Sequence, residues 1–125
     1  MLGTVLLYSG SAIVLIWGAA HFFPTGIIVR GFGPISEDNK KIITMEWLAE
    51  GVAMCYMGIL SILVTAIAGR NCVASMTVYM TTGSVLVVMA VLGWLTYART
   101  PVLPMKLCPW IQTLSALLLI AGAIT

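Results

Sequence analysis

The chain consists of four long apolar segments separated by short polar or proline-containing connections. They extend over about residues 2–23, 42–68, 73–98 and 109–125. A helix needs about 20 mostly apolar residues to cross a membrane, and each segment is close to that length. Strands are excluded because an open sheet edge in hydrocarbon leaves backbone groups unpaired at a cost of several kcal/mol each. We therefore predict an all-α integral membrane four-helix bundle, with residues 1–125 as a single domain.

The composition excludes most other classes of protein. Hydrophobic residues make up 61% of the chain and charged residues 8%, and the net charge is +2. A soluble domain is about one quarter charged, so the solvent of this surface is predicted to be the lipid bilayer. Nucleic acid is not an expected partner, since the basic residues form no run longer than Lys40-Lys41. No room remains for a nucleotide-binding fold, and we expect no cofactor.

Residues typical of helix ends agree with these boundaries. Pro24 closes the first segment, and Gly69 suits the end of the second. Ser36 is a candidate cap for a helical lead-in through residues 37–39. Pro109 is expected in the first turn of the fourth helix, where a missing N–H costs nothing.

The distribution of Lys and Arg predicts the orientation in the membrane. The side with the first and third connections carries five basic residues, and the opposite side carries only Arg70. Cytoplasmic loops are enriched in Lys and Arg. We therefore expect a multi-pass protein with both termini outside and the first and third loops in the cytoplasm.

The first connection, residues 24–41, is too long for a minimal turn and is half apolar. We expect it to fold back as a re-entrant lid or to lie in the interface, covering the region of His21 and Glu50. In that position Arg30 or Asn39 would reach these polar groups. The alternative is a surface loop whose charges are solvated.

Three ionisable residues, His21, Glu46 and Glu50, lie in or beside the apolar segments. Glu46 and Glu50 are one helical turn apart on one face. If the apolar core begins near Ile42, Glu50 is roughly 10 Å along the helix from the interface. An ionised acid at the membrane centre costs about 3 kcal/mol or more, so Glu50 should be protonated, paired or next to a wet cavity. We predict Glu50 and His21 as a proton-transfer pair and Glu46 as an orienting or second acid.

Further aromatic and polar residues are predicted at the same level, where they could line a substrate pocket. They are Trp17, Trp47, Trp94, Trp110, Tyr97 and Gln112. Aromatic walls suit an apolar or cationic intermediate, because cation–π attraction is stronger where water is excluded. The alternatives are an interfacial aromatic belt for the tryptophans and an interhelical hydrogen bond for Gln112.

These residues predict a small membrane enzyme with general acid/base chemistry near the cytoplasmic face. The substrate would be a lipophilic small molecule, and the reaction an isomerisation, an epoxide opening or a cyclisation. The alternative is a non-catalytic accessory or quinone- or lipid-binding subunit, as a homo-oligomer or within a membrane complex. We expect no metal, because His21, Glu46 and Glu50 lack a metal-site spacing. Cys55, Cys72 and Cys108 are expected to be structural thiols.

Two motifs resemble those of small four-helix DoxX-like membrane proteins. The first segment closes in Gly18-Ala19-Ala20-His21-Phe22-Phe23-Pro24, and the second contains Glu50-Gly51 and continues to Gly58. The resemblance covers the first two helices. It implies a scaffold or accessory role, in some members connected with quinone-linked redox chemistry.

Overall fold

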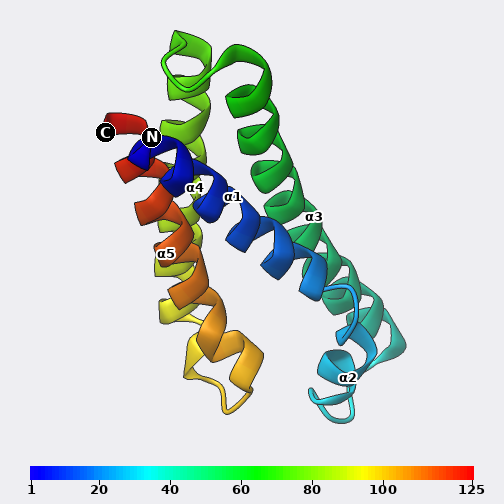
Figure 1. Cartoon of the computed structure of the whole chain (residues 1–125). Helices are drawn as coiled ribbons and strands as arrows, with labels where there is room; N and C mark the ends of the chain where they lie inside the picture. The colour runs from blue at the N-terminus through cyan, green and yellow to red at the C-terminus, as the bar shows by residue number, and fades with distance from the viewer.

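The computed structural model describes all residues from Met1 to Thr125, and every regular element in it is helical (Figure 1). Four long helices, each long and apolar enough to cross a membrane, form the bundle. They are α1 (Leu2–Ala20), α3 (Glu37–Ala68), α4 (Val73–Leu95) and α5 (Leu103–Ile124). A short helix α2 (Thr25–Arg30) and a 3₁₀ helix η1 (Tyr97–Arg99) lie in two of the connections. The prediction of an all-α, multi-pass membrane bundle is confirmed.

The central helix of the bundle is α1, which crosses obliquely between α3 and α5 and packs against both (Figure 1). The remaining helix, α4, packs mainly on α5 and contacts α3 much less. The buried face of α1 includes three glycines; its residues are Gly3, Leu7, Gly10, Ser11, Val14 and Gly18. A Cβ added at Gly18 would lie 2.8 Å from the backbone oxygen of Gly51, so glycine at this crossing allows α1 and α3 to approach closely.

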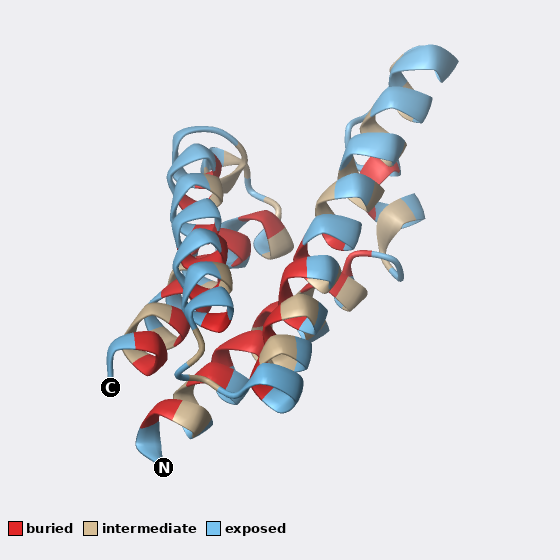
Figure 2. Cartoon of the chain, turned by 90° about the horizontal axis from the view of Figure 1, so that it is seen from above, coloured by how far each residue is buried: buried red, intermediate tan, exposed pale blue.

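The outer surface of the bundle is apolar, and the buried residues face inward between the helices (Figure 2). Large hydrophobic side chains such as Ile16, Ile67 and Val73 are more than two-thirds exposed. Such a surface is unfavourable in water but matches hydrocarbon. The burial pattern is therefore consistent with a lipid environment.

The predicted caps of the second long helix are present. The Ser36 side chain accepts a hydrogen bond from the backbone N–H of Asn39 at 3.2 Å, and α3 begins at Glu37. Gly69 follows the helix with a φ of +73°, a conformation that favours glycine. The first helix ends earlier than predicted, at Ala20 instead of residue 23.

The predicted start of the fourth helix is wrong. The helix begins at Leu103, with Pro104 in its first turn, and Pro109 lies inside it. Proline cannot donate the hydrogen bond that position 109 would make to the carbonyl of Met105, but the rest of the ladder continues past it. Cys108 therefore belongs to a membrane helix and not to a loop.

The first connection contains α2, which packs against α3 through the buried side chains of Ile28 and Val29. The Thr25 hydroxyl donates a hydrogen bond to the carbonyl oxygen of His21 at 2.9 Å and so joins α2 to the end of α1. The connection thus contains a short packed helix, while Arg30 and Asn39 are exposed, as expected for the alternative of solvated charges.

Candidate functional site

Polar side chains from α1, α3, α5 and η1 meet inside the bundle. We define the polar cluster as His21, Glu50, Tyr97, Cys108 and Gln112. One ligand-type atom from each of His21, Glu50 and Cys108 lies within 4.8 Å of the other two. The cluster is positioned by the end of α1, the first half of α3, the 3₁₀ helix η1 and the first three turns of α5.

Glu50 is the hydrogen-bond acceptor at the centre of the polar cluster. Its Oε1 accepts from Gln112 Nε2 at 3.1 Å, from the Tyr97 hydroxyl at 3.4 Å and from the Cys108 thiol at 3.6 Å. The two ion pairs of the chain lie elsewhere, in the first turn of α3. The charge of a Glu50 carboxylate is thus offset by neutral donors only, and all three donors reach Oε1.

His21 is buried directly after the last turn of α1, with 3% of its surface exposed. Its Nδ1 lies 2.8 Å from the carbonyl oxygen of Trp17. A carbonyl oxygen only accepts, so Nδ1 carries the proton, and in the neutral ring Nε2 has a free lone pair. The ring packs against the rings of Trp47 and Trp17, with centroid distances of 4.6 and 6.0 Å.

Glycine at position 51 makes this placement of His21 possible. A Cβ at Gly51 would lie 2.8 Å from the Cβ of His21. The indole N–H of Trp47 donates to the backbone oxygen of His21 at 2.7 Å and ties the end of α1 to α3. The motif residues Gly18, His21 and Gly51 are therefore in direct contact across the α1–α3 crossing.

Cys108 is the member of the polar cluster that the sequence did not identify as a site residue. Its Sγ accepts a hydrogen bond from the Trp17 indole N–H at 3.2 Å, and the residue is 3% exposed. A signal was present, because Cys108 and Gln112 are four residues apart and share a helix face once α5 is extended across Pro109. The expected break at Pro109 concealed it.

Glu50 forms part of the wall between two spaces. The inner one is a cavity of about 60 Å³ bordered by His21, Trp47, Glu50, Tyr97, Met105 and Cys108. Roughly 10–15 Å³ of such volume is enough for one water molecule, so a few waters fit. The outer one is an open groove of about 510 Å³ that also borders Trp47, Glu50, Tyr97 and Met105.

The outer groove continues along the outside of the bundle between α3 and α4. A neighbouring hollow of about 310 Å³ shares Ala53 and Met89 with it and is lined mostly by apolar residues of these two helices. We call the two together the α3–α4 groove. The groove lies between α3 and α4, which pack against each other less than the other neighbouring long helices do. It leads from the apolar surface to Glu50.

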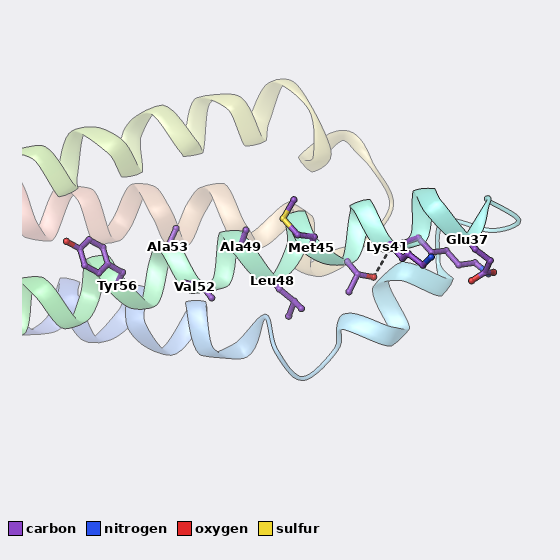
Figure 3. Close-up of a pocket in the computed structure, with 10 residues that line it drawn as sticks. Glu37, Lys41, Met45, Leu48, Ala49, Val52, Ala53 and Tyr56 are labelled. Atoms are coloured by element: carbon purple, nitrogen blue, oxygen red, sulfur yellow. Dashed lines mark hydrogen bonds and ion pairs between the residues drawn. The ribbon is translucent and has the colours of Figure 1, made fainter.

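The largest hollow, about 910 Å³, lies along one face of α3 alone, from Glu37 to Tyr56 (Figure 3). None of its lining residues belongs to the polar cluster. The lysines at its polar end are already paired, Lys40 with Glu37 at 2.6 Å and Lys41 with Asp38 at 3.6 Å. It is an open helix surface.

The structure brings together four of the predicted aromatic and amide residues with His21 and Glu50. They are Trp17, Trp47, Tyr97 and Gln112. Of these, Gln112 is completely buried, and its Oε1 has no hydrogen-bond partner. This acceptor can be satisfied by a water, and the buried hydroxyls of Ser61 and Ser115 likewise lack a partner.

The other predicted site residues lie outside the polar cluster. Glu46 is exposed and lines the outer groove one turn from Glu50, but it makes no side-chain hydrogen bond. Trp94 and Trp110 pack against each other on the outer surface, with ring centroids 5.4 Å apart. Arg30 and Asn39 are exposed, and the structure does not bring either side chain to the polar cluster. From the first connection, Phe32 lines the groove instead.

Comparison of the chain with protein-family models, with curated proteins and with solved structures gives no match. The resemblance to DoxX-like proteins remains a prediction from two short motifs.

Proposed function

We propose that the protein is a small integral membrane enzyme that performs general acid/base chemistry on a lipophilic substrate. The observation that carries the proposal is the position of Glu50 in the wall between the inner cavity and the outer groove. A molecule in the α3–α4 groove would meet a carboxylate on one side, and the carboxylate would meet water and an imidazole on the other.

The two titratable groups have different roles in this proposal. Glu50 is held by three donors and accepts a proton from the substrate or from a cavity water. His21, with Nδ1 held by Trp17, exchanges protons through Nε2. Two groups in different environments can act as acid and base at the same pH. Glu46, one turn along the groove, serves as an orienting or second acid.

The substrate class follows from the groove. Its walls are mostly apolar, it opens on the lipid-facing side, and its length along α3 and α4 suits an extended hydrocarbon chain. Trp47 and Tyr97 border the end near Glu50 and would stabilise a cationic intermediate. Isomerisation, epoxide opening and cyclisation remain the proposed reactions.

We further propose that the site lies near the cytoplasmic face. The polar cluster lies in the half of the bundle next to the first and third connections. These connections and the adjoining first turns of α3 and α5 carry Arg30, Lys40, Lys41, Arg99 and Lys106, in agreement with a cytoplasmic side.

Isotope incorporation tests the chemistry without a known substrate. Purified protein in vesicles of bacterial total lipid extract is incubated in D₂O and, separately, in H₂¹⁸O, and the lipids are analysed by mass spectrometry. Isomerisation or cyclisation introduces deuterium into a C–H bond, and epoxide opening introduces ¹⁸O. Wild type and the control E37Q, in which only an exposed ion pair changes, should incorporate the same isotope. A wild-type protein that incorporates neither isotope from the extract contradicts the proposal.

The alternative, a non-catalytic accessory or quinone-binding subunit, is favoured by one observation. The bonds from Gln112 and Tyr97 to Glu50 also join α5 and η1 to α3, as a purely structural polar cluster would. If this is the whole role of Glu50, E50Q destabilises the protein or breaks a complex, and the wild type shows no isotope incorporation.

A further inference from the structure

We infer that His21, Glu50 and Cys108 form a binding site for one divalent transition-metal ion of the zinc class. Each residue comes from a different part of the chain, and their ligand-type atoms are all within 4.8 Å of one another. Ion binding is independent of catalysis. A catalytic role of the ion rests on the proposed function, since the same cavity and carboxylate are used. With the ion bound, His21 Nε2 and Glu50 would be ligands, and a water in the fourth position would take over the proton exchange.

The distances suit a tetrahedral ion. Zinc binds nitrogen and oxygen at about 2.0–2.2 Å and sulfur at about 2.3 Å, which places neighbouring ligand atoms about 3.4–3.7 Å apart. Cys108 Sγ and Glu50 Oε1 are 3.6 Å apart, within this range. The ligand atom of His21 is within 4.8 Å of the other two, so binding an ion requires it to move inward by at most about 1 Å.

Each ligand is held in orientation by a neighbour, as is typical of metal sites. The Trp17 carbonyl accepts from His21 Nδ1 at 2.8 Å and thereby directs the lone pair to Nε2. The Trp17 indole N–H donates to Cys108 Sγ at 3.2 Å, an interaction that stabilises a thiolate. Gln112 donates to Glu50 Oε1 at 3.1 Å.

The chemistry of the ligands selects the ion. One thiolate, one imidazole and one carboxylate favour zinc and its neighbours over magnesium or calcium, which take oxygen ligands. On binding, the Cys108 thiol releases its proton to water, and the two ligand anions are neutralised by the ion. The adjoining cavity of about 60 Å³ leaves room for a water in the fourth position, the arrangement of a catalytic zinc site.

Cobalt substitution tests the site by spectroscopy. Purified protein in detergent is titrated with CoCl₂, and the near-ultraviolet band of charge transfer from thiolate to cobalt is recorded. Zinc stoichiometry is measured by equilibrium dialysis against ZnCl₂ with elemental analysis. The C72S variant is the matched control, because Cys72 lies at the start of α4 on the opposite side of the bundle.

We expect one zinc per chain and a charge-transfer band in wild type and C72S. The C108S variant should lack the band and bind zinc at least about tenfold more weakly, and W17F, which keeps all three ligands, should weaken binding about 10–100-fold. If C108S does not fold, the band in a C55S/C72S chain, where Cys108 is the remaining thiol, gives the same information. A wild type without the band, or a C108S variant with unchanged zinc affinity, overturns the inference.

Failure of the metal site and failure of the proposed function give different results. If the protein binds no zinc and isotope incorporation survives both EDTA and the C108S substitution, the metal site is refuted and the acid/base chemistry of Glu50 stands. Zinc binding without isotope incorporation supports the site and removes the catalytic proposal.

Discussion

Substitution of Gly51 by alanine should separate α1 from α3 and displace His21. The new Cβ would lie 2.8 Å from the Cβ of His21 and 3.0 Å from the carbonyl oxygen of Gly18. Neither neighbour is the end of a flexible side chain. The two helices must therefore move apart by about 0.6 Å to reach an ordinary contact of 3.4 Å.

The expected cost is a difference of two terms. Overpacking a close contact costs about 1–3 kcal/mol. Alanine is about 1 kcal/mol better than glycine in a helix, which offsets part of that cost. The net loss of unfolding free energy should thus be about 0–2 kcal/mol. Isotope incorporation should fall because His21 moves relative to Glu50.

Unfolding in mixed micelles of mild detergent and SDS, followed by circular dichroism, measures this loss. The matched control is G26A, since a Cβ at Gly26 has no neighbour within 4 Å and its φ is not positive. This control should be unchanged or slightly stabilised. A G51A protein as stable as G26A, with wild-type isotope incorporation, would refute the close α1–α3 contact and the placement of His21.

Three further substitutions separate the site from its surroundings. Q112L removes the shortest hydrogen bond to Glu50 together with a buried unpaired acceptor, so the unfolding free energy should change by less than about 1.7 kcal/mol. Isotope incorporation should fall at least about tenfold, and unchanged incorporation would contradict the role of Gln112. S36A loses the cap of α3, which should cost about 1 kcal/mol of unfolding free energy and speed hydrogen exchange at residues 37–40. Isotope incorporation should be unaffected, and a loss of incorporation would show that the cap also positions the site. R30A should change neither quantity, because Arg30 is exposed, and a loss of incorporation would show that the first connection reaches the polar cluster after all.

Much of the fold was predictable because the membrane imposes simple requirements. Four apolar segments could only be helices, and Ser36 and Gly69 mark the ends of α3 by local chemistry. The buried face of α1 carries Gly3, Gly10 and Gly18, because small residues allow close helix contacts in membranes.

The arrangement of the site was less predictable, for physical reasons. Proline is tolerated both at a helix start and, at moderate cost, inside a helix, so Pro109 concealed Cys108. In hydrocarbon an apolar helix has no strong hydrophobic preference for one face, and Trp94 and Trp110 could equally have faced inward. Glu50 was identified because an acid within a membrane segment is costly. Glu46 lies one turn nearer the start of α3 and is exposed.

The central claim is that Glu50 transfers protons to or from a lipophilic molecule. The most direct test is the rate of isotope incorporation by E50Q and by wild type, reconstituted side by side in the same lipid extract. The glutamine side chain can still accept the hydrogen bond from Gln112, so E50Q should keep its helical content. We expect E50Q to lower the rate by about 10²–10⁴-fold, the usual contribution of a general acid or base. A folded E50Q protein that incorporates the isotope at the wild-type rate would contradict it.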